Sequence, residues 1–242
     1  MSTASRRSAS CMVVALLVAP AAAAPQTGTI IGTVTISGAV PSPQRLSVTT
    51  DRDSCGETVL ARDVVVRDGS LANAVAFVEG IEGETEPGEY SLGNSDCLFD
   101  PPVLAATVGS ELVVANHDEM MHNTHLFFRY GSRRRTVGNW GLPREGAIIR
   151  NSRALRRPGI IDVECDVHPW MHATIRVFDH PHFAISSQSG AFEISGVPVG
   201  EHTLKVWHEV FGELQQSVTV EVGVTTTVSF EFSADNVGQG SP

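Results

Sequence analysis

Residues that can bind a soft metal ion lie close together in the second half of the sequence. A cysteine, a histidine and a methionine follow one another at three-residue spacing, as Cys165, His168 and Met171. A further histidine, His122, lies upstream of them. Thiolate and thioether are soft ligands, and two imidazoles with one thiolate and a weak axial methionine form the ligand set of mononuclear copper sites. The spacing therefore predicts a site for one copper ion.

Short β-strands are expected to position these ligands. Cys165 directly follows one alternating segment, and Met171 lies shortly before another. Turn residues separate many such segments, and no window keeps a helical period. The pattern predicts an all-β chain of the sandwich or barrel class. The expected strands are residues 29–36, 63–67, 74–79, 103–107, 111–116, 124–128, 147–149, 159–164, 174–178, 183–186, 191–194, 203–207, 216–222 and 225–232.

The first 24 residues are typical of a secretory signal peptide. Arg6 and Arg7 precede an apolar run at residues 11–19, and the alanines that follow offer a cleavage site within residues 22–24. The residues after the arginine pair lack the apolar pair of a twin-arginine signal, so ordinary export is the favoured interpretation. No later segment reaches the ~18 apolar residues of a membrane span. We therefore expect a soluble periplasmic or secreted protein without a transmembrane segment.

The cysteine count points to one disulfide and one metal-binding thiol. Cys11 leaves with the signal peptide, so three of the four cysteines remain in an oxidising compartment. Cys55 and Cys97 have similar loop-like surroundings, and a disulfide between them is the simplest pairing. Cys165 is then left without a partner, which supports its role as a metal ligand.

The chain is acidic overall but contains one basic stretch. Its 242 residues include 17 Lys and Arg against 27 Asp and Glu, a formal net charge of −10, which argues against a general nucleic-acid-binding protein. Nine arginines fall between residues 129 and 157, where Glu145 is the one acid. One interpretation is a solvated set of loops. The other is a docking patch at Arg133, Arg134 and Arg135 for an acidic redox partner, such as a c-type cytochrome or a periplasmic dehydrogenase, because complementary charge speeds encounter.

Residues 103–178 resemble the cupredoxins, and most of all the amicyanins. The likeness is carried by Val108-Gly109, by residues 113–116, by His122-Asn123-Thr124-His125 and by Cys165-Asp-Val-His-Pro-Trp-Met171. The resemblance implies a Greek-key β-sandwich in which His122, Cys165 and His168 bind one type 1 copper ion, with Met171 as the axial ligand. It also implies that Asn123 forms hydrogen bonds across to the cysteine loop and so holds the two ligand loops together.

Additional histidines and methionines surround the expected site and are not part of that pattern. They are His117, Met120, Met121, His125 and His172. Surface or rim positions are the favoured interpretation for all five. The alternative is that His117 and His125 make extra metal contacts, either to a second copper ion or in copper acquisition.

The C-terminal part, residues 184–232, resembles the carboxypeptidase regulatory-like, or transthyretin-like, β-sandwich. A Ser189-Gly190 turn, the turn from Gly196 to Gly200 and the alternating strand after it carry this likeness. The strand that begins at Gly28 looks like the first strand of that family, so it is expected to pair with the C-terminal module. Such modules generally act as non-catalytic attachments. The expected organisation is a signal peptide at 1–24, an N-terminal β segment at 25–60, a cupredoxin-like copper domain at 61–179, a carboxypeptidase regulatory-like module at 180–232 and a disordered tail at 233–242.

Three functions agree with these features. The favoured one is a periplasmic type 1 copper protein that transfers single electrons between redox partners through an exposed His168. The second is a copper carrier or chaperone in which the loop at residues 117–125 takes part. The third is a non-catalytic adhesion or carbohydrate-binding β-sandwich protein. Catalysis is not expected, because no nucleophile–base or paired-carboxylate constellation is evident and four protein ligands leave little room for a substrate.

Overall fold

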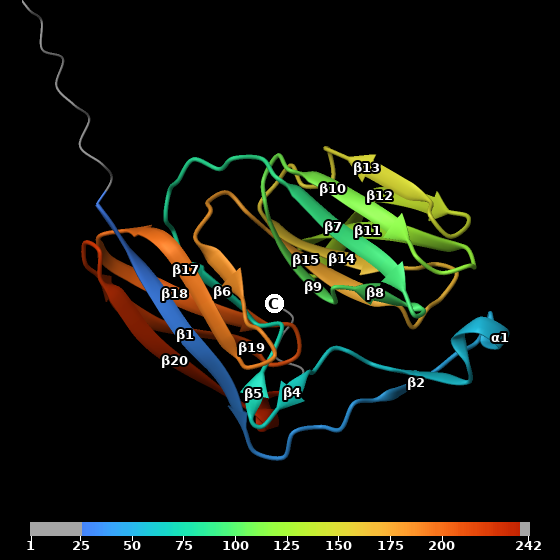
Figure 1. The fold of residues 1–242 in the computed structure, drawn as a ribbon, viewed down its shortest axis with the longest axis horizontal. Helices are drawn as coiled ribbons and strands as arrows, with labels where there is room; N and C mark the ends of the chain where they lie inside the picture. The colour runs from blue at the N-terminus through green and yellow to red at the C-terminus, as the bar shows by residue number, and fades with distance from the viewer. Residues whose placement is uncertain (1–25, 238–242) are drawn as a thin grey trace, which may run out of the picture.

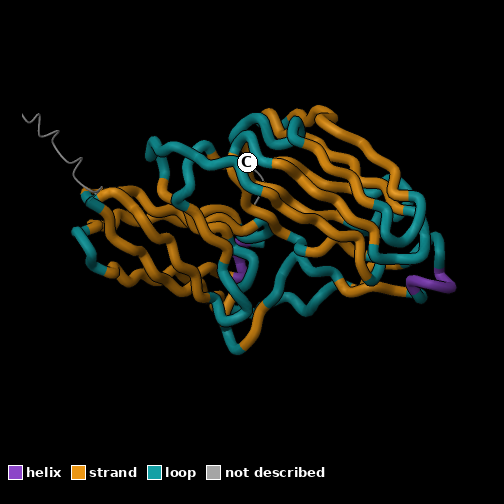
Figure 2. Tube along the Cα trace, turned by 45° about the horizontal axis from the view of Figure 1, so that its top comes forward, coloured by secondary structure: helices purple, strands orange, loops and turns teal. Residues whose placement is uncertain are grey.

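The computed structural model describes residues 26–237, so the expected signal peptide lies outside the described residues. Strands make up most of the described chain (Figure 2), which confirms the predicted all-β class. Within this range the one α-helix is α1 (Arg52–Cys55), and no helix there is long and apolar enough to cross a membrane. The strands form two β-sandwiches that lie next to each other (Figure 1).

The first sandwich contains the residues expected to bind a metal ion. Its two sheets have the strand orders β13-β10-β7-β8 and β12-β11-β14-β15-β9. Alternating apolar side chains, among them Leu92, Leu126, Ile161 and Ile175, are fully buried in its core. The strands are β7 (Glu89–Ser95), β8 (Leu98–Asp100), β9 (Val103–Thr107), β10 (Glu111–Asn116), β11 (His122–Tyr130), β12 (Arg133–Leu142), β13 (Ile148–Asn151), β14 (Gly159–Glu164) and β15 (His172–Phe178).

The second sandwich joins the two ends of the chain. The first strand, β1, pairs antiparallel with β17 and parallel with β20, as the sequence predicts. β1 and β17 pack closely at Gly32. A side-chain Cβ added to this glycine would lie only 2.3 Å from the Phe192 ring, so a larger residue does not fit there. The strands are β1 (Thr27–Ser37), β4 (Val66–Arg67), β5 (Ser70–Leu71), β6 (Val75–Val78), β16 (Phe183–Ile185), β17 (Ala191–Pro198), β18 (Gly200–His208), β19 (Gly212–Val220) and β20 (Thr225–Ser233).

The chain crosses between the sandwiches more often than the expected domain boundaries imply. β4, β5 and β6 belong to the second sandwich, although the sequence assigned residues 61–179 to the copper domain. Conversely, residues 45–60 extend along the lower edge of the first sandwich (Figure 1). This segment, called the arm below, contains α1 between the paired strands β2 (Arg45–Ser47) and β3 (Thr58–Leu60). Its Val48 is fully buried in the core of the first sandwich.

A small apolar cluster joins the two sandwiches. Phe77 of β6 and Phe178 of β15 have ring centroids 5.2 Å apart, and Trp207 of β18 is buried beside them. The Arg176 guanidinium lies 4.2 Å from the centroid of the Phe77 ring. After β20 the chain forms a 3-10 turn (Ala234–Asn236), where the sequence predicted the start of a disordered tail. The remainder of that tail, residues 238–242, lies outside the described residues.

We expect acid to destabilise the second sandwich through His208. This side chain is 1% exposed, and burial lowers its pKa from 6.5 to about 4. As the pH falls through 6.5, the unfolded chain therefore binds a proton that the folded chain does not bind until about pH 4. The free energy of unfolding should decrease by about 3 kcal/mol across that window and level off below it.

Urea denaturation between pH 6 and pH 4 of the wild type and of His208→Gln measures most of this effect, because Cys165, with a pKa of about 6, changes the free energy of unfolding chiefly above that range. The variant should lose most of the slope, whereas His117→Gln, which replaces an exposed histidine, should keep it. Burial also lowers the pKa of His180 and His182, so a smaller slope should remain in the His208 variant. Equal slopes in all three proteins would contradict the prediction.

Candidate metal centre

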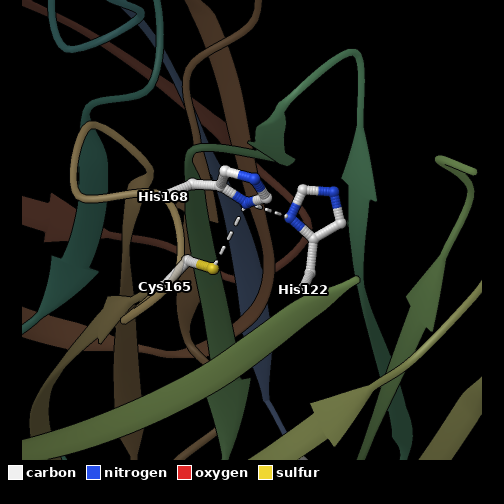
Figure 3. Close-up of side chains that lie close together, drawn as sticks. All are labelled: His122, Cys165 and His168. Atoms are coloured by element: carbon white, nitrogen blue, oxygen red, sulfur yellow. Dashed lines mark hydrogen bonds between the residues drawn. The ribbon is translucent and has the colours of Figure 1, made fainter. Parts of the chain in front are cut away.

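Three buried side chains converge at one end of the first sandwich, as Figure 3 shows. The potential ligand atoms of His122, Cys165 and His168 all lie within 4.8 Å of one another. The His122 and His168 Nδ1 atoms are 2.9 Å apart, and the Cys165 Sγ lies 3.7 Å from the His168 Nδ1. Their residues are 0%, 2% and 0% exposed, respectively. The structure thus brings together three of the four residues that the sequence predicted as copper ligands.

Strand ends and one short loop determine these positions. His122 is the first residue of β11, and Cys165 directly follows β14. The loop from Cys165 to β15 folds back on itself, because the Met171 N–H donates to the His168 carbonyl and the Cys165 N–H donates to the Met171 carbonyl. β11 and β14 are paired neighbours in the same sheet. Because the loop folds back, the two residues between Cys165 and His168 place the histidine next to the cysteine, and both face the strand that carries His122.

Two carboxylates fix the orientation of the histidine rings. The His122 Nε2 lies 2.9 Å from a carboxylate oxygen of Asp118, and the His168 Nε2 lies 2.8 Å from one of Asp51. An ionised carboxylate only accepts hydrogen bonds, so both Nε2 atoms carry a proton. The two Nδ1 atoms therefore face each other, and only one proton fits on the line between them. Burial lowers the pKa of His168, but contacts with Cys165 and Asp51 outweigh burial and raise it above 6.5. Metal-binding histidines almost always donate their other N–H to such a partner.

A cation resolves this arrangement. The two Nδ1 atoms, 2.9 Å apart, can share one proton or can bind a metal ion in its place, and the Cys165 sulfur adjoins them. Burial raises the pKa of Cys165, but contacts with His122, His168 and the Asn123 backbone N–H outweigh burial and lower it from 9.0 to about 6. At neutral pH a thiolate therefore stands beside the two nitrogens. This soft donor set of two imidazoles and one thiolate fits copper.

Asn123 links the two ligand loops. Its side-chain oxygen accepts a hydrogen bond from the Asp166 N–H at 2.6 Å and lies 3.3 Å from the Cys165 Sγ. Its side-chain nitrogen donates to the Asp166 carboxylate and to Asn139, each at 2.8 Å. The residue next to His122 is thereby bonded to the residue next to Cys165. These are the cross-loop contacts that the sequence resemblance implied for Asn123.

The arm covers the site, which the sequence did not predict. The expected disulfide between Cys55 and Cys97 is present and ties the arm to the turn between β7 and β8. Asp51 approaches His168 from the arm with left-handed backbone geometry, φ 50°, a conformation that Asp tolerates better than most residues. The other side of His168 faces the Trp170 ring, with centroids 5.0 Å apart. His168 is therefore fully buried, and the expectation of an exposed His168 was wrong.

The other candidate residues have their own surroundings. Met171 is 1% exposed within the core of the first sandwich. His125 has both ring nitrogens engaged, one with Asp166 at 3.0 Å and the other with Thr136 at 2.9 Å. His117 is exposed, and His172 pairs with Asp63 at 2.7 Å. Among the described residues, the metal-binding group contains neither His117 nor His125.

Sequence reasoning missed Asp118 and Asp51, for different reasons. Asp118 could have been found from its neighbours in the sequence, because Asn116 and Asp118 are typical turn residues close to His122. In the structure the Asn116 side chain accepts the Asp118 N–H at 2.9 Å. Its carboxylate also accepts from the backbone of Asp96 and Cys97, so it is held rigidly. Asp51 had no local indication, since it lies more than one hundred positions before His168. The disulfide between Cys55 and Cys97 and the burial of Val48 in the first core hold it near the site.

The predicted docking patch lies away from the metal-binding group. Arg133, Arg134 and Arg135 pair with residues 128–130 at the end of β11, whereas His122 lies at its start. Six residues of strand separate His122 from the partner of Arg135, a distance of about 20 Å. Arg134 also forms an ion pair with Glu164. Exposed acidic residues lie instead beside Asp118, the partner of His122: Asp53, Asp96 and Glu119 line the same hollow next to the disulfide.

Comparisons with known proteins give one family match and several similar solved structures. The family model of the carboxypeptidase regulatory-like domain matches residues 163–233, and no curated protein matches the chain. Among solved structures, a purple cupredoxin from Nitrosopumilus maritimus is 18% identical over 38% of this chain and 100% of its own, with a TM-score of 0.30. An amicyanin variant is 19% identical over 43% and 98%, with a TM-score of 0.31.

A copper-containing nitrite reductase from Thermus scotoductus SA-01 is also similar. It is 22% identical over 39% of this chain, with a TM-score of 0.32. This chain spans 23% of the length of that reductase.

Proposed function

We propose that this protein binds one copper ion through His122, Cys165 and His168 and transfers single electrons. The observation that carries the proposal is the convergence of two imidazole nitrogens and one cysteine sulfur in a site closed to solvent. A copper ion bound there would exchange one electron between its two oxidation states. Met171, buried in the same loop, is proposed as the weak axial ligand.

The rigidity of the donor groups supports electron transfer over copper delivery. Asp118 and Asp51 hold the two rings, and Asn123 joins the loops that carry His122 and Cys165. Ligands that keep their positions through a redox cycle keep the reorganisation small. A carrier must instead exchange its metal with a partner, and complete burial of all three residues slows such exchange.

Charge and burial suggest where a redox partner binds. Asp51 connects the buried His168 ring to the surface. Its carboxylate accepts a hydrogen bond from the ring, and its side chain is 41% exposed. The acidic surroundings of this position favour a basic face on the partner, because complementary charge orients the encounter. The partner class remains a c-type cytochrome or a periplasmic dehydrogenase, but we move the contact from Arg133–Arg135 to the end that carries the arm.

We also propose that the protein acts in the periplasm or outside the cell and is not a catalyst. The disulfide between Cys55 and Cys97 supports an oxidising compartment. The burial of all three donor residues leaves a substrate no access to them. The second sandwich then serves as a structural or binding module.

Copper titration of the purified metal-free protein tests the proposal. We expect an intense visible charge-transfer band that saturates at about one copper per chain, and a reversible one-electron reduction in a spectroelectrochemical cell. Colourless Cu(I) binding without a stable oxidised form would favour the carrier. The absence of copper binding would overturn both and leave an interaction module.

A further inference from the structure

A small cavity far from the metal-binding group is lined by arginines. It has a volume of about 270 Å³ and lies between the end of the β11–β12 hairpin and the loop before β14. Four arginine residues line it, with Phe128 and Tyr130 as the aromatic part of the wall. The four are Arg135, Arg153, Arg156 and Arg157. The lining contains no acidic residue.

These four arginines differ from the others in the basic stretch. Arg129 forms an ion pair with Asp162, Arg134 with Glu164, and Arg150 with Glu89 and Glu111. Within residues 26–237, none of the four arginines at the cavity forms an ion pair with a carboxylate. Carboxylates thus balance the charge of several nearby arginines, whereas the positive charges of the four arginines at the cavity are not balanced. Their mutual repulsion is relieved when a negative group binds between them.

The cavity is preformed by its backbone. The side-chain oxygen of Asn151 accepts the N–H groups of Arg153 and Ala154, each at 2.8 Å. Leu155 is fully buried in the core of the first sandwich, which anchors the middle of the loop. The Arg156 Nε donates to the Arg153 carbonyl at 3.0 Å. Three of the arginines therefore extend from a fixed loop and Arg135 extends from β12, so the backbone around the cavity needs little ordering when a ligand binds.

We propose that this cavity binds a small oxyanion with two or more negative charges, either a polycarboxylate or phosphate. A planar guanidinium matches carboxylate and phosphate oxygens with two parallel hydrogen bonds. The volume lies just below the range of about 300–1,000 Å³ of drug-sized ligand pockets, which suits a compact anion. The proposal is independent of copper, because the metal-binding group lies at the other end of β11.

Titration calorimetry and thermal unfolding of the full chain test the site. The probes are citrate and inorganic phosphate, each compared with sodium chloride at the same ionic strength. We expect saturable binding near one anion per chain and a melting temperature that rises with anion concentration beyond the effect of chloride. Tighter binding of citrate identifies a polycarboxylate site, and equal or tighter binding of phosphate identifies a phosphate site.

Two double variants distinguish anion binding at the cavity from the general effect of positive charge on the protein. Arg153→Gln with Arg157→Gln removes two charges at the cavity, and should weaken binding about tenfold or more. Arg133→Gln with Arg144→Gln removes two exposed arginines that do not line it, and should leave the dissociation constant within about twofold. Equal weakening in both variants, or no saturable binding above chloride, would overturn the proposal.

Discussion

Replacement of Cys165 by serine is expected to abolish the visible charge-transfer band of the copper-loaded protein. The band requires a thiolate bound to copper, and Cys165 is the one free cysteine among the described residues. A hydroxyl is a harder and far less acidic donor, so copper affinity should also fall. We expect copper affinity to decrease more than about 100-fold. The loss of a residue that only hydrogen-bonds to a metal ligand already decreases metal affinity by up to about 100-fold, and Cys165 is proposed as a ligand itself.

A control variant on the same strand sharpens this result. His125→Gln removes an imidazole three residues from His122, but one whose nitrogens already contact Asp166 and Thr136. It should keep the band and the copper stoichiometry. Urea denaturation of the metal-free Cys165→Ser protein checks that the fold survives. An intense band in that variant would show that Cys165 is not a ligand.

The candidate metal-binding group could be predicted because Cys165, His168 and Met171 form a local motif and the resemblance supplied His122. Cys165 and His168 are three residues apart in one loop, and the pairing of β11 with β14 is the common outcome for strands in a small sandwich. The disulfide followed from elimination, since only Cys55 and Cys97 had comparable loop surroundings. Asn123 followed from the resemblance. None of these inferences required knowledge of which distant segments pack together.

The strands without an apolar pattern were missed. β12 is exposed at most of its positions, so its sequence has no alternation for a period-two search to detect. β7 contains Gly93 and Asn94 and likewise has no regular apolar face. β6 was detected, but all four of its residues are buried. A continuously buried strand does not indicate its neighbours, and so the sequence assigned β6 to the wrong sandwich.

The burial of His168 was missed because it depends on a long-range contact. The resemblance covered only residues 103–178, whereas the cover is provided by the arm at residues 45–60. Nothing in the sequence near Asp51 indicates that its carboxylate meets an imidazole in another part of the chain. Prediction of the cover would have required the path of the arm, and that path is restrained chiefly by a disulfide.

The arm is expected to control access to the site, and the double variant Cys55→Ser with Cys97→Ser should open it. The disulfide spans 42 positions, and a crosslink of that length stabilises a fold by about 2–5 kcal/mol. Without it, the arm is held near His168 mainly by the Asp51 contact and by buried Val48. Transfer of copper to an excess of chelator should become about tenfold faster or more.

Alkylation of Cys165 provides a readout that needs no metal. Within residues 26–237 of this variant Cys165 is the only thiol, so mass spectrometry of the Cys165 peptide from iodoacetamide-treated metal-free protein reports its exposure directly. We expect faster alkylation than in the wild type, because opening of the arm exposes a thiol that is 2% exposed in the closed state. Asp51→Asn is the matched control, since it keeps the tether and changes only the group that faces His168. If neither copper transfer nor alkylation accelerates in the double variant, the arm is not the barrier, and access to the site must pass through the loop between Cys165 and Met171 instead.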